Sequence, residues 1–240
     1  MGELAESLNV SEMTVRRDLE KLERDGKLRR VHGGVVSNQS VTATFEQPFE
    51  ETRGRQVRAK KLIAEAAASL VSPGSAIALL GGSSVYALAE QLTNHSNLTI
   101  VTNSIPVSDL FSSSASRGIT VYLSGGSRTP TDSLIGNLAV DAFAQFNFDT
   151  VFMGSLGMEA QAGFSAPSLA EAETNRAIMR QAHRSAVLVD HTKWGVKGFS
   201  SFASLSEVDV LIVDSGINNG DLAQLREMSK KVIVANGGAK

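Results

Sequence analysis

Hydrophobic and polar positions follow two different patterns along this chain. In the first 36 residues, short apolar stripes recur at helical spacing among many charged residues. From residue 56 onward, short runs of Val, Ile and Leu alternate with segments in which apolar residues recur every three or four positions. Continuous apolar runs that alternate with helices are typical of parallel strands covered on both faces. The pattern therefore predicts an α/β fold with a mostly parallel sheet in the larger part of the chain.

Three regions follow from this pattern: residues 1–36, a linker at 37–55 and a large domain at 56–240. The linker is polar and aperiodic and contains a proline, features that are typical of a connecting segment. The predicted strands of the large domain are 75–81, 97–103, 118–126, 148–155, 185–192, 208–216 and 231–236. Its predicted helices include 59–71, 85–92, 133–146 and 167–183.

The stretch VSEMTVRRDLEKLERDG, residues 10–26, predicts a half-buried helix. Ser11 is a good N-cap, because its side-chain oxygen can accept a bond from a free N–H group of the first turn. Val10 and Val15 stand at the two positions of a hydrophobic staple, and Gly26 supplies the left-handed stop. The apolar face comprises Val15, Leu19 and Leu22.

The segments on either side complete the pattern of a winged helix-turn-helix. ELAESL upstream is a second short helix, and the three-residue link NVS is typical of the turn in this motif. KLRRVHGGVV downstream alternates in character around Gly-Gly and predicts a pair of strands, the wing. Arginine near the start of a recognition helix can bond guanine edges, and basic residues on a wing can lie along phosphates. The candidate DNA-binding residues are Ser11, Met13, Thr14, Arg16, Arg17 and Lys21 on the helix and Arg29, Arg30 and His32 on the wing.

Composition alone leaves a second interpretation of this region open. Residues 1–36 contain seven Lys or Arg and seven Asp or Glu, and the whole chain has a net charge of −2. A balanced charge of this kind is also typical of a helix whose charged face is simply solvated. Any DNA-binding function must therefore be local.

The block SLNVSEMTVRRDLEKLERDGKLRRVHGGVV resembles the signature of DeoR-type repressors. Residues at the signature positions include Ser11, Thr14, Arg16, Arg17, Asp18, Leu19, Leu22, Gly26, Leu28, Arg30, His32, Gly33 and Gly34. The resemblance implies a winged helix-turn-helix that binds operator DNA. Members of that family have about a further helix and a half before the segment that corresponds to GELAESL, so we expect the first helix of the domain to be missing here. The apolar residues Leu4, Leu8, Leu19 and Leu22 are then expected to be partly uncovered.

The ends of the predicted strands in the large domain are rich in Gly, Ser, Thr, Asn and Asp. Ligands of parallel α/β sheets bind beyond the carboxyl ends of the strands. In GGSSVYALAEQL, Gly81 and Gly82 make a turn, and Ser83 and Ser84 open a helix with free N–H groups that suit an anion. Lys193 supplies a cation nearby. An ordinary strand-to-helix turn has the same composition, and a dinucleotide fingerprint is absent from the sequence.

Residues 45–235 resemble the sensor domain of the same family, which is related to the ribose-5-phosphate isomerase type of fold. Its motifs appear as LLGGSSVYALAEQL, TNSIPV, YLSGGS, FMGSLGMEAQAGFS and LVDHTKWG. The resemblance implies a phosphorylated sugar as the effector and a homo-oligomer, either a dimer or a tetramer. It places the phosphate on Gly81, Gly82, Ser83 and Ser84 with help from Asn103, Ser104 and Lys193, and the sugar hydroxyls at Gly125, Gly126, Gly154, Gly157 and Asp190.

Other features narrow the class of protein. The chain has no cysteine, its apolar runs are far shorter than a membrane span, and its first residues lack a signal pattern. We therefore expect a cytoplasmic protein without contact with a membrane. The four histidines show no metal spacing, so neither a metal nor a cofactor is expected.

These observations favour a DNA-binding transcriptional regulator over an enzyme. We expect it to be a repressor of a sugar-utilisation operon. The first alternative is a sugar-phosphate isomerase, which needs a base with a tuned pKa. Asp190, Glu171, Glu173 and His191 are the candidates for that base, and none has a partner pattern that favours catalysis. The second alternative is a sensor without a working DNA-binding head that modulates full-length partners.

Overall fold

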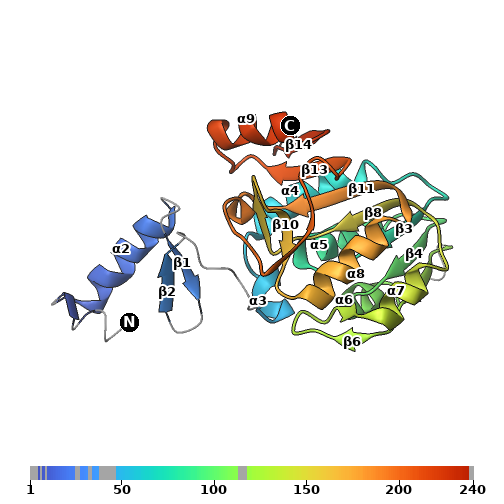
Figure 1. Cartoon of the computed structure of the whole chain (residues 1–240), viewed down its shortest axis with the longest axis horizontal. Helices are drawn as coiled ribbons and strands as arrows, with labels where there is room; N and C mark the ends of the chain where they lie inside the picture. The colour runs from blue at the N-terminus through green and yellow to red at the C-terminus, as the bar shows by residue number, and fades with distance from the viewer. Residues whose placement is uncertain are drawn as a thin grey trace. The chain divides into compact units, whose positions relative to one another are not determined.

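The computed structural model describes residues 5, 7–8, 10–24, 28–31, 34–37, 47–112 and 118–237, with the backbone alone for residues 24, 28–31 and 34–37. The chain divides into two compact units, residues 1–42 and 43–240 (Figure 1). Each unit has a hydrophobic cluster of its own.

The first unit is built around the predicted helix of residues 10–26. Helix α2 spans Glu12–Arg24, and it starts where Ser11 caps it: the Thr14 N–H donates to Ser11 Oγ at 3.2 Å. Val15 and Leu19 are buried in a cluster with Ala5, while Leu22 is half-buried. The capped, amphipathic helix that the sequence predicts is thereby confirmed.

A two-stranded antiparallel sheet follows α2, as predicted for the wing. Strand β1 (Leu28–Val31) pairs with β2 (Gly34–Ser37), and Val31 lies opposite Gly34. Leu4, Gly26 and the residues between the two strands lie outside the described part of the chain. Leu8 is 62% exposed, in line with the expectation of an uncovered apolar surface. For Leu19 that expectation was wrong, because Ala5 and Val15 cover this side chain.

The second unit contains a seven-stranded sheet in which every pairing is parallel. Its strands, in spatial order, are β14 (Val232–Ala235), β13 (Val210–Asp214), β11 (Ala182–Val189), β8 (Phe148–Met153), β3 (Ala76–Leu79), β4 (Thr99–Thr102) and β5 (Thr120–Leu123). Each of the seven predicted strands is present. The fold class predicted from the apolar runs is confirmed.

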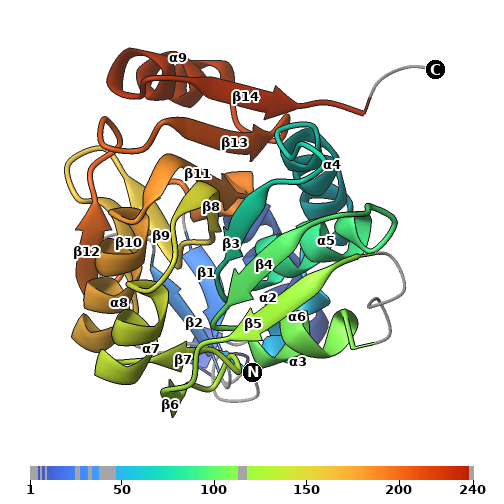
Figure 2. The same ribbon diagram turned by 90° about the vertical axis from the view of Figure 1, so that its right-hand side faces the viewer.

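Helices cover both faces of this sheet, as Figure 2 shows. Helices α4 (Val57–Ala68), α5 (Ser83–Leu92) and α6 (Ile105–Leu110) share one hydrophobic cluster with one face of the sheet. Helices α7 (Asn137–Phe143), α8 (Leu169–Met179) and α9 (Asn219–Met228) share a second cluster with the other face. Neighbouring residues of strand β3 enter different clusters: Leu79 lies in the first and Ala78 in the second. The continuous apolar runs of the sequence are explained by this burial on both sides.

Two smaller sheets were not predicted. Strands β9 (Gly157–Glu159), β10 (Gly163–Ala166) and β12 (Ser200–Ala203) form an antiparallel sheet, and β6 (Ser127–Arg128) pairs with β7 (Leu134–Ile135). The predicted helix 133–146 was therefore too long at its start. Leu134 instead donates its N–H to the carbonyl of Asn103 and continues as a strand. The predicted helix 167–183 likewise ends at Met179, because β11 begins at Ala182.

A short helix lies within the stretch predicted as a linker. Helix α3 (Phe49–Arg53) belongs to the second unit, in which Phe49 is buried and meets the ring of Tyr86 edge-on at 5.1 Å. Arg53 pairs with Glu90 at 3.1 Å and lies 4.6 Å from the centroid of the same ring. The sequence of α3 does not predict these contacts, because Phe49 is the one apolar residue among four polar ones. Residues 38–46 of the predicted linker lie outside the described part.

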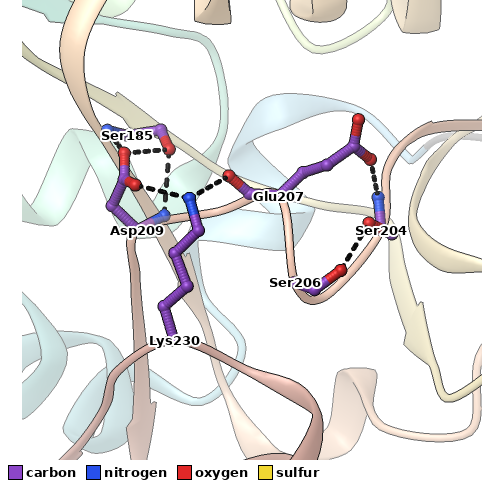
Figure 3. Close-up of polar contacts among 6 residues, drawn as sticks. All are labelled: Ser185, Ser204, Ser206, Glu207, Asp209 and Lys230. Carbon is purple, nitrogen blue, oxygen red and sulfur yellow. Dashed lines mark hydrogen bonds and ion pairs between the residues drawn. The ribbon is translucent and has the colours of Figure 1, made fainter.

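A polar cluster ties the amino-terminal end of β13 to β11 (Figure 3). Asp209 accepts hydrogen bonds from the N–H and the hydroxyl of Ser185, at 2.9 and 3.0 Å. Lys230 donates to the same carboxylate at 2.8 Å and to the carbonyl of Glu207 at 3.3 Å. Ser204 donates its N–H to Glu207 Oε2, which closes the neighbouring turn. This cluster lies at the opposite end of the strands from the candidate ligand site.

In the part of the chain that the structure describes, none of the helices has the length and apolar character that crossing a membrane requires. The same residues contain no group of three or more His, Asp or Glu side chains placed to hold a metal ion.

Candidate DNA-binding surface and effector site

The predicted DNA-contacting residues of α2 lie on its exposed surface. Met13, Arg17 and Lys21 follow one another at intervals of four, so they form a stripe on the side away from the buried Val15 and Leu19. Ser11, Thr14 and Arg16 are exposed beside this stripe. Met13 is 73% exposed, which is unusual for a large apolar side chain in a helix. The helix therefore presents a mixed basic and apolar surface of the kind that suits base edges and phosphates.

For the predicted DNA-contacting residues of the wing, the structure describes less than for those of α2. Arg29 and Arg30 lie on β1, of which the structure describes the backbone, and His32 lies outside the described residues. Strand β1 follows directly after α2 in the first unit. The roles of these three residues in DNA binding stay predictions.

The residues predicted to bind the effector gather at one edge of the large sheet. Parallel strands end on the same side, and β3, β4, β5, β8 and β11 all lead into a predicted segment there. These segments contain Gly81, Gly82, Ser83, Ser84, Asn103, Ser104, Gly125, Gly126, Gly154, Asp190 and Lys193. Gly157 is placed differently, in β9 of the small sheet. A Cβ atom there would lie 2.2 Å from the carbonyl oxygen of Val196, so glycine permits close packing of the segment that follows Lys193.

Glycines at the end of β3 bring the backbone close to its neighbours. A Cβ at Gly81 would lie 1.8 Å from Ser133 Oγ, which leaves no room for a side chain. Gly82 has a φ of +124°, a conformation that favours glycine, and forms the N-cap of α5. Among the described residues, no side chain caps this helix. The first-turn N–H groups of Ser83 and Ser84 are thus arranged as helix N-termini are when they bind anions.

Asn103 and Ser104 hold this turn in place. Asn103 is buried, accepts the Gly81 N–H at 2.8 Å and donates to the Leu134 carbonyl at 3.0 Å. Ser104, also buried, caps α6 by accepting the Val107 N–H at 3.4 Å. Both side chains therefore have protein partners in this structure. The family resemblance implies that they help to hold a phosphate; the structure shows that they fix the loops at this edge of the sheet.

Asp190 and Lys193 lie in the turn after β11. Asp190 is buried and caps the 3-10 turn His191–Lys193, because its Oδ1 accepts the N–H of Thr192 at 3.0 Å and the hydroxyl of the same residue. Lys193 is the last residue of that turn and is half-buried. One carboxylate thus sets the conformation of the segment that carries the predicted cation.

Lys60 is a candidate site residue that the sequence analysis missed. It lies on α4, is 6% exposed, and its Nζ donates to the carbonyls of Thr52 at 2.5 Å and Arg55 at 2.7 Å. Burial lowers the pKa of Lys60 to about 8, against the raising effect of Asp190, and the positive charges of Lys193 and Arg55 lower it further. The charges of Asp190 and Lys193, two residues of the predicted effector site, therefore both act on Lys60.

A signal for Lys60 was present in the sequence. It stands three and four positions before Ile63 and Ala64, on the stripe of α4 that is buried against the sheet. A lysine at a position where the helical pattern requires an apolar residue is costly, unless a ligand or a specific environment compensates.

The two units together indicate a class of protein: a head with a capped, exposed basic helix and a two-stranded wing, and a parallel-sheet domain with glycine-rich strand ends. Comparisons with known protein families agree. Residues 1–41 match the DeoR-like helix-turn-helix domain, and residues 55–215 match the DeoR C-terminal sensor domain. The chain belongs to the DeoR family of transcriptional regulators. This membership confirms the predicted DNA-binding regulator and the expectation that the protein is not an enzyme.

Several relatives are similar over nearly the whole chain. The lactose phosphotransferase system repressor of Staphylococcus epidermidis is 35% identical over 234 residues, covering 97% of this chain and 90% of the relative. The repressor of the same name from Staphylococcus aureus is 36% identical, with coverage of 89% and 84%. That of Streptococcus mutans is 36% identical, with coverage of 98% and 91%.

Solved structures show only a distant likeness. Ribose 5-phosphate isomerase A from Methanocaldococcus jannaschii has a TM-score of 0.41 and 17% identity, covering 56% of this chain and 53% of that chain. The delta subunit of eIF2B from Chaetomium thermophilum has a TM-score of 0.41 and 20% identity, covering 59% and 50%. The chain thus spans about half the length of these structures. Scores this low have no bearing on function.

Proposed function

We infer that the protein represses sugar-utilisation genes in the cytoplasm, and that a phosphorylated sugar at the carboxyl edge of the large sheet changes its affinity for operator DNA. The relatives named as lactose phosphotransferase system repressors support the first part, because that name describes repression of sugar-related genes. The observation that carries the second part is the buried Lys60, whose charged form is disfavoured by burial and by the positive charge of Lys193. A dianionic phosphate at Lys193 would offset this repulsion, so binding of such a ligand would be favourable.

The predicted site fits the remaining chemistry of such a ligand. The uncapped start of α5 offers N–H groups to the phosphate oxygens, and the glycines next to it let those oxygens approach the backbone. Asp190 is an acceptor that suits sugar hydroxyls. The ligand can change DNA binding only if it binds one arrangement of the protein better than the other.

We further propose that the protein acts as a dimer or tetramer. Two heads that engage two half-sites raise the overall affinity through effective concentration, without any new contact. Sedimentation velocity at the working protein concentration tests this. A complex that contains one protein chain per operator DNA molecule would contradict the proposed oligomer.

Thermal unfolding in the presence of sugar phosphates tests the sensor. The panel contains ribose 5-phosphate, glucose 6-phosphate, galactose 6-phosphate and fructose 1-phosphate, with inorganic phosphate as the reference. At 100 times its dissociation constant, a ligand of the folded state adds about 2.7 kcal/mol of stability. We expect saturable stabilisation by at least one sugar phosphate, lost in Lys193→Met and kept in Lys197→Met, an exposed lysine of the same segment. If the sugar phosphate stabilised both variants equally, Lys193 would not be part of the binding site.

Operator binding tests the head. Fluorescence anisotropy with labelled DNA from upstream of the protein's own gene should show binding that weakens steeply with salt. The double substitution Arg16→Ala and Arg17→Ala should abolish this binding, whereas Arg180→Ala in the sensor unit should not. Unchanged binding by the double variant would overturn the assignment of α2 as the recognition helix.

A further inference from the structure

The carboxylate of Asp214 lies next to the turn that carries Asp190 and Lys193. Asp214 is the last residue of β13, and Val213 pairs with Val189, the residue before Asp190. The side chain of Asp214 is 7% exposed. Buried at the carboxyl edge of the sheet, it has no place in the effector site predicted from the sequence.

Three hydrogen bonds converge on this carboxylate. Its Oδ1 accepts the backbone N–H of His191 at 2.7 Å, and its Oδ2 contacts His191 Nδ1 at 2.9 Å. Its Oδ2 also accepts the N–H of Gly216 at 2.9 Å. Because His191 is the first residue of the 3-10 turn, Asp214 holds both the backbone and the side chain at the start of that turn.

Steric fit makes this contact specific. A Cβ atom at Gly216 would lie 2.4 Å from His191 Nδ1 and 2.7 Å from Asp214 Oδ2, so the imidazole packs directly against the backbone of this loop. The turn is then held from two sides: Asp190 caps it at Thr192, and Asp214 fixes His191. Lys193 directly follows Thr192 at the end of this turn, so we expect its position to depend on the contacts of Asp190 and Asp214.

Electrostatics strengthens the pair. The hydrogen bond to Asp214 raises the pKa of His191, against the opposing effect of burial, and the negative charges of Asp214 and Asp190 raise it further. Burial by itself would raise the pKa of Asp214, but the hydrogen bonds from His191 and Gly216 outweigh it and the pKa is lowered. A protonated imidazole beside an ionised carboxylate makes a charge-assisted bond, which is about twice as strong as a neutral one.

We propose that Asp214, acting through His191, is a positioning residue for effector binding that holds the turn with Asp190 and Lys193 in its binding geometry. This inference rests on the proposed sugar-phosphate site. It adds two residues that touch neither the phosphate nor the sugar, yet set the affinity for both. The chemical class of ligand is a sugar phosphate whose anionic group lies at Lys193.

The same strand offers a matched control at its other end. Asp209, directly before β13, accepts three hydrogen bonds as Asp214 does, from Ser185 and Lys230, and also ties β13 to β11 (Figure 3). Loss of either carboxylate removes a comparable set of bonds from the same pair of strands. Only Asp214 is next to the predicted site, so the two variants separate a positioning effect from a general loss of stability.

The experiment compares Asp214→Ala with Asp209→Ala in the full chain, by isothermal titration with the sugar phosphate that stabilises the wild type most. Both variants should unfold at lower temperature than the wild type. We expect the affinity of Asp214→Ala for the sugar phosphate to fall by at least roughly tenfold, the loss that follows from a charged hydrogen bond, and that of Asp209→Ala to stay within about twofold. Equal affinities of the two variants would overturn the proposal and leave the proposed sensor function standing.

Substitutions of His191 give a second, milder test, because this side chain is one-third exposed. Asn places an amide N–H close to the position of Nδ1, whereas Leu has a similar volume and no donor. His191→Asn should therefore keep most of the affinity, and His191→Leu should lose about as much as Asp214→Ala. Equal affinity in both His191 variants would show that the hydrogen bond has no positioning effect. A wild type that binds none of the panel would overturn the proposed sensor function, and this inference with it.

Discussion

Replacement of Lys60 by methionine should remove a pH-dependent part of the stability. The pKa of Lys60 is lowered from 10.5 to about 8 in the folded protein. Between these two values the unfolded chain binds more protons than the folded one, so the free energy of unfolding rises with pH across this range. A shift of about 2.5 units at 1.36 kcal/mol each sets an upper limit of about 3 kcal/mol. Solvent screening reduces this, and we expect about 1 to 3 kcal/mol.

Urea unfolding at pH 7, 8, 9, 10 and 10.5 measures this difference. The wild type should gain about 1 to 3 kcal/mol relative to Lys60→Met between pH 8 and pH 10.5. Methionine also loses the two bonds to the carbonyls of Thr52 and Arg55, but that loss offsets the curve without changing its slope. Lys61→Met, an exposed lysine of the same helix, is the control and should run parallel to the wild type. Parallel curves for the wild type and Lys60→Met would refute the argument that burial disfavours the charged lysine.

Three further outcomes follow from the structure. Effector affinity, measured by isothermal titration, should fall as the pH rises through about 8, because Lys60 then loses the charge that attracts the phosphate. An affinity that does not change with pH in this range would show that Lys60 does not contribute to ligand binding. Gly81→Ala should cost about 1 to 3 kcal/mol in urea unfolding, since its Cβ would overlap Ser133 Oγ, and a second substitution Ser133→Gly should recover most of it. Ser11→Ala should cost the first unit about 1 kcal/mol through loss of the N-cap of α2, seen as a lower midpoint of helix melting by circular dichroism; an unchanged midpoint would contradict the cap.

The local features of the chain could be predicted from the sequence because they depend on residues close together in it. The start of α2 needs only Ser11 and the N–H of Thr14, three positions away. The parallel strands need only a continuous apolar run, since both faces are buried, and each strand end then carries the polar residues that follow it. The segments at the candidate site could therefore be predicted as a set.

Contacts between distant segments were not predictable in this way. Leu134 and Ile135 follow a helical pattern, but pairing with Ser127 and Arg128 makes them a strand. The polar helix α3 packs on α5 through the ring of Phe49 and through Arg53. In both cases a partner from elsewhere in the chain outweighs the local preference.

The features of the candidate site likewise include some that the sequence predicts and some that depend on the tertiary structure. Periodicity and turn composition in the sequence determined a capped amphipathic helix, a parallel sheet and the glycine-rich strand ends, because each of these depends on neighbouring residues. Only the tertiary structure decided that Lys60 is buried under the influence of the Lys193 charge and that Asp214 binds His191, because the residues concerned come from separate parts of the chain. Burial and charge then changed the pKa values of these groups, and a pKa depends on what surrounds a side chain in space rather than on its position in the sequence.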